Sequence, residues 1–220
     1  MTVVYMTLFF ILSYILGSIP SGLIIGKVFR DIDIREHGSK NTGATNAIRV
    51  LGFKYGVWAF VFDILKGAFV IAILSFFKME SLYLIEPMEM NILMLYGAFA
   101  VLGHVWPIYI NFKGGKAVAT SAGVVTALAP WIALIVITVF FIMFFITRYV
   151  SKSSTMAAIT ALSMFVLRIF VDSSQNLATH LMNLFVISAL ATIIFIRHRA
   201  NYKRLREGTE YRFDKKKTTA

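Results

Sequence analysis

Uninterrupted apolar runs constrain this chain more than any other feature. A helix of about 20 apolar residues is long enough to cross the hydrocarbon core of a bilayer. The chain has 220 residues, of which 58% are hydrophobic and 15% charged, and its mean hydropathy is +0.75. The runs are continuous rather than alternating, which disfavours a β-barrel. We therefore expect an all-α fold, a polytopic transmembrane helical bundle.

About seven spans are predicted. They cover residues 1–26, 55–77, 91–110, 117–128, 131–149, 154–170 and 177–196. The fourth would rise only about 18 Å, so it crosses only if it is tilted or thinly covered, or if the loop before it dips into the membrane. Pro20 should break the first helix near its inner end.

Basic residues set the predicted orientation. The chain has 22 Lys and Arg against 11 Asp and Glu, a net charge of +11. In a seven-span layout, all the basic residues except Lys66, Lys78 and Arg168 fall in segments on one side. Because cytoplasmic loops are rich in Lys and Arg, we predict the N-terminus outside and the C-terminus in the cytoplasm. We expect one integral membrane domain, residues 1–206, and a basic cytoplasmic tail, residues 207–220.

Composition also excludes several kinds of chemistry. The chain has no cysteine, which rules out disulfides, thiolate nucleophiles and cysteine-bound zinc or iron–sulfur clusters. It has no His and carboxylate cluster at metal-ligand spacing and no GxSxG nucleophile motif. The sequence therefore offers no metal site of these kinds. The positive charge of a membrane protein points to anionic lipid rather than to nucleic acid.

The first polar cluster is the loop Gly38–Asn46, followed by Arg49. It offers hydroxyl groups, amides, backbone N–H groups and two cations between two apolar runs. Such a glycine-containing turn can form an anion-binding concavity, and an arginine adds a two-pronged donor for phosphate. An ordinary solvated loop explains the same residues equally well.

The second cluster is Lys113-Gly-Gly-Lys116, which directly precedes a predicted helix. Two glycines would let the backbone approach a phosphate at the helix N-terminus, and two ammonium groups would add charge. The spacing is not that of a P-loop, and a basic turn is the plainer alternative. His104 lies three residues before Pro107. A buried core histidine and a substrate ligand are comparable interpretations of His104.

The third cluster runs from Arg197 to Glu210. A helix here would place His198 and Asn201 on one face, three residues apart. A basic segment that holds lipid headgroups explains most of its cations. Elsewhere, Asp63 and Lys66 are spaced to pair within a helix, as are Arg168 and Asp172, and both pairs are interpreted as structural.

Together and in order, these motifs resemble those of the bacterial acyl-phosphate:glycerol-3-phosphate acyltransferases, over nearly the whole chain. The matching segments are Gly17–Gly22, Gly38–Asn46 with Arg49, Asp63–Gly67, Gly103-His104 with Pro107, Phe112–Thr120, and Arg197–Glu210. Two positions depart from the family pattern. Lys40 stands where the family often has Gly, and Ala117 stands where Gly is usual. Neither change removes a proposed ligand.

The resemblance implies a reaction at the cytoplasmic face of the bacterial inner membrane. Acyl phosphate would donate its acyl chain to the 1-hydroxyl of glycerol 3-phosphate, giving lysophosphatidic acid and phosphate. It implies no metal and no cofactor, and the departing phosphate could itself take the hydroxyl proton. The partners would be acyl phosphate, glycerol 3-phosphate and membrane lipid, and the expected state is a monomer.

The resemblance also implies roles for individual residues. The expected catalytic residues are Ser39, Arg49, Lys116, His198 and Asn201. The expected substrate-binding residues are Asn41, Thr42, Asn46, His104, Lys113, Gly114, Gly115, Thr120, Arg204 and Glu210. One phosphate is expected at residues 113–116 and the other at the loop with Arg49, in either order, while His198 and Asn201 orient the glycerol hydroxyls.

The competing interpretation is a membrane transporter of a small organic phosphate. It would use the same anion-binding groups on the same scaffold. Against it stand the lack of an internal repeat and the crowding of the polar motifs on one predicted face. The acyltransferase interpretation requires all three polar segments to meet in one pocket.

Overall fold

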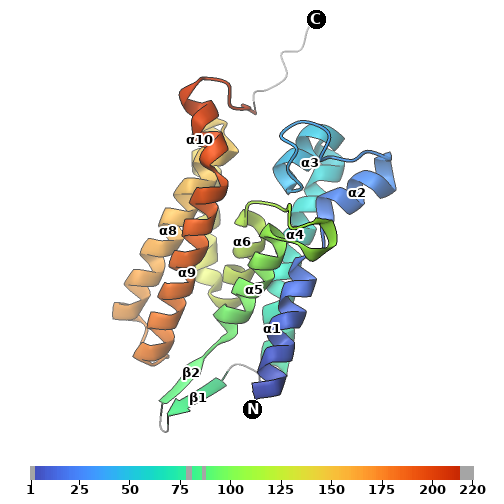
Figure 1. Ribbon diagram of the computed structural model, residues 1–220. Coiled ribbons are helices and arrows are strands. Elements are labelled where there is room, and N and C mark those ends of the chain that lie inside the picture. Colours follow the sequence, from blue (N-terminus) through green and yellow to red (C-terminus); the bar gives the residue numbers. More distant parts are fainter. Residues whose placement is uncertain (1–2, 78–80, 86–87, 214–220) are drawn as a thin grey trace, which may run out of the picture.

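The computed structural model describes residues 3–77, 81–85 and 88–213 (Figure 1). Lys78, one of the three basic residues outside the predicted cytoplasmic segments, lies outside the described residues. The lysines of the predicted tail, residues 215–217, lie outside them too.

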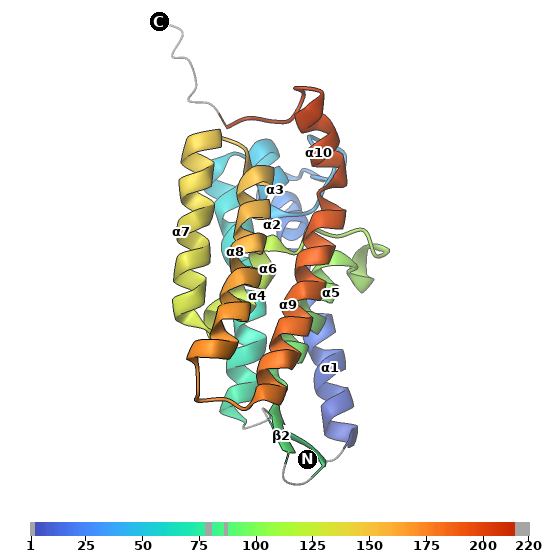
Figure 2. The ribbon, with the colours of Figure 1, turned by 90° about the vertical axis from the view of Figure 1, so that its left-hand side faces the viewer.

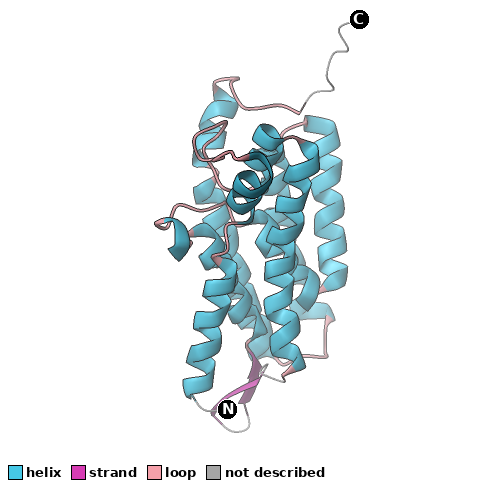
Figure 3. Cartoon of the chain, turned by 90° about the vertical axis from the view of Figure 1, so that its right-hand side faces the viewer, coloured by secondary structure: helices cyan, strands magenta, loops and turns pink. Residues whose placement is uncertain are grey.

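The described chain is almost entirely helical (Figure 3). The α-helices are α1 (Val3–Gly17), α2 (Ser21–Arg30), α3 (Ala44–Leu51), α4 (Phe53–Phe76), α5 (Leu93–Val105), α6 (Val118–Leu128), α7 (Pro130–Thr147), α8 (Val150–Val171), α9 (Leu177–Arg197) and α10 (Arg199–Arg206). A 3₁₀ helix, η1 (Ile108–Ile110), follows α5. Strands β1 (Ser81–Ile85) and β2 (Met88–Asn91), which were not predicted, pair in antiparallel fashion between α4 and α5, with Ser81 opposite Asn91.

Pro20 breaks the first apolar run as predicted, and a second proline follows the end of α5. Pro20 separates α1 from α2, and Pro107 separates α5 from η1. Proline lacks a backbone N–H and clashes with the preceding helical turn, so both breaks follow from local chemistry. The first apolar run is therefore two helices joined at a bend rather than one.

The long helices form an up-and-down bundle (Figures 1 and 2). The N-terminus and the hairpin lie at one end, and α3 and α10 lie at the other. Among the described residues, six elements are long and apolar enough to cross a membrane: Val4–Arg30, Phe53–Phe76, Leu93–Ile110, Pro130–Thr147, Val150–Val171 and Leu177–Arg197. These elements confirm the predicted helical membrane bundle.

Helix α6 takes the place of the predicted fourth span. Its 11 residues rise about 16 Å, too short to cross a bilayer alone. Its side chains are largely buried inside the bundle, and Val124 is completely inaccessible. A short helix is tolerated at membrane depth when protein surrounds it. The chain still reverses direction across α6, so α1 begins at one end of the bundle and α10 lies at the other (Figure 1).

Helix α3 was not predicted. The polar loop that was expected to extend to Asn46 stops at Gly43, which adopts an extended conformation, and the chain is helical from Ala44. Ala47 and Leu51 lie one helical turn apart and pack with Ile25 of α2 and Ala59 of α4. This packing places Arg49 on a rigid element instead of a loop.

Candidate active site

The three polar segments contact one another at the α3–α10 end of the bundle. The Asn41 side chain donates a hydrogen bond from Nδ2 to the carbonyl oxygen of Gly114, 3.1 Å away. The Arg197 guanidinium donates to the Gly114 carbonyl at 2.9 Å and to the Gly115 carbonyl at 3.2 Å. The predicted meeting of the segments that begin at Gly38, Lys113 and Arg197 is confirmed.

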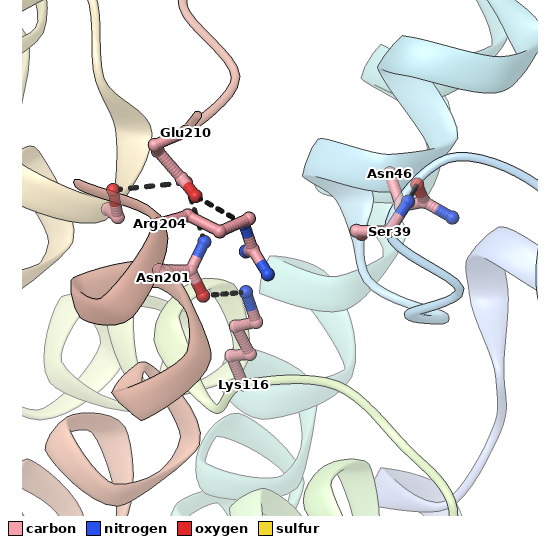
Figure 4. Close-up of polar contacts among 7 residues, drawn as sticks. Ser39, Asn46, Lys116, Asn201, Arg204 and Glu210 are labelled. Carbon is pink, nitrogen blue, oxygen red and sulfur yellow. Dashed lines mark hydrogen bonds and ion pairs between the residues drawn. The ribbon is translucent and has the colours of Figure 1, made fainter. Parts of the chain in front are cut away.

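A hydrogen-bond network links Lys116 to Glu210 (Figure 4). Lys116 Nζ donates to Asn201 Oδ1 at 2.5 Å, and Asn201 Nδ2 donates to Glu210 Oε1 at 2.6 Å. Arg204 Nε donates to Glu210 Oε2 at 2.8 Å, and Ser151 Oγ donates to Oε1 at 3.2 Å. The carboxylate thus fixes the Asn201 amide with its oxygen toward Lys116.

Positive charge is in excess around Lys116. Burial, together with the guanidinium groups of Arg204, Arg49 and Arg197 and against the opposing charge of Glu210, lowers the pKa of Lys116 from 10.5 to about 8. Among the described residues that act on this site, four cations (Lys116, Arg204, Arg49 and Arg197) thus face one carboxylate, that of Glu210. A site with this imbalance attracts anions.

Arg49 has an unused donor. Its Nε is buried with no hydrogen-bond partner in the described part of the chain. Burial also lowers the pKa of the Arg49 guanidinium. Buried polar groups are nearly always hydrogen-bonded, so an exception needs an explanation. An anionic ligand at Arg49 would supply the missing acceptor.

His198 joins α9 to α10 and is almost fully buried. Its Nδ1 lies 2.8 Å from the carbonyl oxygen of Ile194. A carbonyl only accepts, so Nδ1 carries the hydrogen and Nε2 remains an acceptor. Burial, with a smaller contribution from the Lys116 charge, lowers the pKa of His198 to about 4. The imidazole is neutral at pH 7 and is a weak base.

Residues Lys113–Lys116, here called the glycine turn, do not present the backbone N–H groups that were predicted to bind a phosphate. The N–H of Gly114 donates to the Val105 carbonyl at 3.2 Å, and the N–H of Gly115 donates to the His104 carbonyl at 2.9 Å. Neither N–H is available to a phosphate. A Cβ on Gly115 would lie 2.0 Å from His104 Nε2, so this position requires glycine for close packing.

Free N–H groups begin after the glycines. The first hydrogen bond within α6 runs from the Ser121 N–H to the Ala117 carbonyl. The first turn of any α-helix lacks internal acceptors for its N–H groups. The N–H groups of Val118 to Thr120 are therefore unpaired within α6, and the helix dipole adds positive potential beside Lys116.

Both departures from the family pattern lie at left-handed backbone positions. Lys40 has φ 57° and Ala117 has φ 72°. Glycine adopts this conformation without strain, whereas a side chain makes it costly. The expected glycines are thus explained by backbone geometry rather than by contact with a ligand.

A buried cluster of ionisable side chains packs against the glycine turn. The predicted pairing of Asp63 with Lys66 is confirmed at 2.9 Å, and His104 Nδ1 lies 3.5 Å from the same carboxylate oxygen. Lys66 also donates to the Ile19 carbonyl at 2.9 Å. His104 packs against Gly115 through its ring, so the geometry favours the core histidine over the substrate ligand. The predicted Arg168–Asp172 pair is also present, at 2.7 Å.

Some predicted ligands have other contacts. The Asn46 side chain accepts from the Ser39 N–H at 2.8 Å and donates to the Ile34 and His37 carbonyls at 2.8 and 3.2 Å. Its polar atoms are occupied, so it holds Ser39 in place. Figure 4 draws Ser39 and Asn46 as a group separate from the Lys116 network.

Three further predicted ligands lie outside the Lys116 network. The Lys113 side chain is exposed. Thr42 is buried at 6% exposure. Thr120 is fully buried, and its backbone lies against Gly67 of α4. The predicted residues that come together are Arg49, Lys116, His198, Asn201, Arg204 and Glu210.

Two residues of the site were missed. Ser151 at the start of α8 gave no signal in the sequence. Tyr211 was included in a basic tail, although its ring lies 4.1 Å from Arg49 Cζ. Two aromatic residues in that tail, Tyr211 and Phe213, were the available signal. The predicted boundary between domain and tail therefore separates residues that pack together.

An apolar pocket of about 340 Å³ opens beside the polar site. It is formed by α4, α6, α7, α8 and α9, and residues such as Phe60, Val118, Phe140, Ser154, Ala158 and Ile194 line it. Val118 lies only two residues after Lys116 along the chain. The structure therefore places an apolar pocket next to a cluster of cations.

Known proteins are similar to this chain over nearly its whole length. The family model for glycerol-3-phosphate acyltransferase matches residues 7–208. The chain is 41% identical over 226 residues to the glycerol-3-phosphate acyltransferase of Acholeplasma laidlawii, covering 99% of this chain and 97% of that protein. It is 45% identical over 203 residues to that of Bacillus subtilis (strain 168), covering 92% of this chain and 95% of that protein.

Solved structures agree. The glycerol 3-phosphate form of PlsY (YgiH), an integral membrane glycerol 3-phosphate acyltransferase, matches with a TM-score of 0.80 and 39% identity, covering 94% of this chain and 95% of that one. Its lysophosphatidic acid form matches with a TM-score of 0.78 and 38% identity, covering the same shares of the two chains. Fold and site thus define an integral membrane acyltransferase. The chain belongs to the glycerol-3-phosphate acyltransferase family, which confirms the resemblance seen in its motifs.

Proposed function

We propose that this enzyme transfers an acyl chain from acyl phosphate to the 1-hydroxyl of glycerol 3-phosphate, giving lysophosphatidic acid and phosphate. The observation that carries the proposal is the surplus of cations around Lys116 next to an apolar pocket. Both substrates carry a phosphate, and only the donor carries a long acyl chain. The cations suit the phosphate groups, and the apolar pocket suits the acyl chain.

Two phosphates need two sets of donors. Lys116 and the unpaired N–H groups at the start of α6 make one set. Arg49 makes the other, with its unpartnered Nε, and the loop around Ser39 lies on the same side. Arginine binds a phosphate through two parallel N–H groups, which also fixes its orientation. Both sets have donors to spare in the described residues.

The donor is activated before it binds. In acyl phosphate the acyl carbon is joined to a good leaving group, so positioning and charge stabilisation supply most of the acceleration. The hydroxyl oxygen forms a bond to the acyl carbon while the bond from that carbon to the phosphate oxygen breaks. The departing phosphate takes the electron pair and the hydroxyl proton. Lys116 and Arg49 stabilise the negative charge that develops on the carbonyl oxygen.

His198 orients the acceptor in this scheme. With a pKa of about 4, its imidazole is a poor proton acceptor at neutral pH. Its Nε2 can still accept a hydrogen bond from a glycerol hydroxyl. His198 and the fixed Asn201 amide therefore hold the hydroxyls in position, and the phosphate receives the proton.

The acyl chain occupies the apolar pocket. From Val118 to Thr126 the pocket follows α6 for about 12 Å. With carbon–carbon bonds near 1.5 Å, an extended chain advances about 1.25 Å per carbon, so about ten carbons fit along this wall. The remainder reaches surrounding lipid. We place the polar end at the cytoplasmic face of a bacterial inner membrane, with the N-terminus outside, and we propose a monomer.

The test uses purified protein in detergent with palmitoyl phosphate and glycerol 3-phosphate. We expect lysophosphatidic acid and phosphate to appear together and to saturate with glycerol 3-phosphate. Detergent removes the compartments that a transporter needs, so a transporter would release no phosphate. A protein that binds both substrates but forms no product would refute the proposal.

A further inference from the structure

The chain turns back over the polar site after α10. Gly208 has φ 69°, and the N–H groups of Thr209 and Glu210 both donate to the Arg204 carbonyl, at 2.9 and 3.2 Å. Residues 208–213, here called the strap, then run from α10 toward the end of α7 (Figure 2). At its far end the Phe213 N–H donates to the Arg148 carbonyl at 3.0 Å. The family model ends at residue 208, where the strap begins.

Aromatic rings fasten the strap at its far end. The ring of Phe213 lies 5.7 Å from that of Phe144 in α7. The ring of Tyr211 meets Phe213 edge-on at 4.8 Å. Glu210 fastens the near end through Asn201, Arg204 and Ser151. The strap is therefore held at both ends while it passes the site.

Tyr211 lies directly on a residue of the site. Its ring centre is 4.1 Å from Arg49 Cζ, while 41% of the tyrosine remains exposed. Such a stack uses the face of the guanidinium group and leaves its N–H edges available. Arg49 Nε has no hydrogen-bond partner in the described chain. Tyr211 therefore holds the plane of Arg49 without occupying the donors that a phosphate needs.

We propose that the strap closes the polar site to water, with Tyr211 as the residue that positions Arg49. This inference rests on the proposed function. Acyl phosphate can lose its acyl group to water as well as to glycerol 3-phosphate. Exclusion of water from a closed site suppresses such side reactions. The strap therefore decides which oxygen receives the acyl chain.

Product ratios distinguish the two reactions. In transfer, a glycerol hydroxyl oxygen bonds to the acyl carbon, and lysophosphatidic acid and phosphate form. In hydrolysis, a water oxygen bonds to the same carbon, and a free fatty acid and phosphate form. Each reaction releases one phosphate, and only transfer makes lysophosphatidic acid. The ratio of lysophosphatidic acid to phosphate therefore measures how well the site excludes water.

The experiment compares the full-length enzyme with Tyr211→Ala, Tyr211→Phe and Phe213→Ala in detergent. Phe170→Ala is the matched control, because Phe170 is 80% exposed near the other end of α8. We expect a ratio near one for the unmodified enzyme, for the control and for Tyr211→Phe, which keeps the ring. We expect Tyr211→Ala to lower the ratio and to reduce kcat/KM about tenfold. Phe213→Ala lowers the ratio with a smaller loss of rate.

A second measurement does not depend on activity. Backbone hydrogen exchange across residues 208–213 should be slow in the unmodified enzyme and in Tyr211→Phe, and faster in Tyr211→Ala. Slower turnover of Tyr211→Ala with an unchanged product ratio would overturn the proposal, as would equally fast exchange in all variants. An unmodified enzyme that makes no lysophosphatidic acid would refute the proposed function instead, and exchange would still decide whether the strap is closed.

Discussion

The pKa of Lys116 predicts how the enzyme responds to alkaline pH. A phosphate ligand needs the ammonium form of this lysine, and burial lowers its pKa from 10.5 to about 8. The free enzyme should therefore lose its affinity for phosphate substrates as the pH rises through about 8. A phosphate ionises for the second time near pH 6, so the substrates themselves are constant in charge over this range.

The expected magnitude follows from the pKa. At pH 7 about nine-tenths of Lys116 is charged in the free enzyme, and at pH 9 about one-tenth. The fall from 10.5 to about 8 corresponds to about 3 kcal/mol of destabilisation borne by the folded protein below pH 8. The unfolded chain binds more protons between those two values, so stability should rise with pH across that window.

The assay measures kcat/KM for glycerol 3-phosphate in detergent between about pH 6.5 and 9.5, because this parameter reports groups of the free enzyme. We expect a decline that approaches tenfold per pH unit above about 8. Lys116→Arg is the control, since arginine stays charged throughout. Its rate should be lower but independent of pH over this range. A flat profile for the unmodified enzyme, or the same decline in Lys116→Arg, would refute the reasoning.

Three further changes test separate parts of the structure. Gly115→Ala should lower the stability by about 1–3 kcal/mol and raise KM for phosphate substrates, because the new methyl group meets His104 Nε2 at 2.0 Å. Lys40→Gly should raise the stability by about 0.5–1 kcal/mol by relieving φ 57°, as measured by thermal unfolding. Glu210→Gln should reduce kcat more than tenfold while the fold persists, since the Arg204 and Asn201 contacts weaken together.

A different result would contradict each of these three predictions. Normal stability and KM in Gly115→Ala would mean that the turn has room for a side chain. Lys54→Gly in helix α4 is the control for Lys40→Gly, and it should destabilise by about 1 kcal/mol. Losses of equal size at both lysines would contradict the strain argument. Full activity of Glu210→Gln would show that the carboxylate does not orient Asn201.

Much of the fold follows from local properties of the sequence. Apolar length predicts the long helices, and Pro20 predicts the break after α1. The meeting of the polar segments follows from the same logic, because an alternating bundle brings every second loop to one end. Helix α3 escaped prediction because its apolar residues make a helix only when α2 and α4 cover them.

The details of the site depend on long-range contacts that no motif encodes. Glycines between lysines suggested free N–H groups, yet both N–H groups pair with carbonyls at the end of α5. Tyr211 resembled a residue of a solvated tail, yet it stacks on Arg49 of α3. In both cases the partner is distant in the sequence, and only tertiary structure brings it near.

The two lysines of the glycine turn offer the most direct test that phosphate binds at the Lys116 network. Lys113 and Lys116 flank the same glycines, but only Lys116 bonds to Asn201. Calorimetric titration of glycerol 3-phosphate into the purified protein should show that Lys116→Ala weakens binding about tenfold to a hundredfold, as expected for loss of a charged hydrogen bond. Lys113→Ala should bind within about twofold of the unmodified enzyme. Equal losses in the two variants would contradict the account.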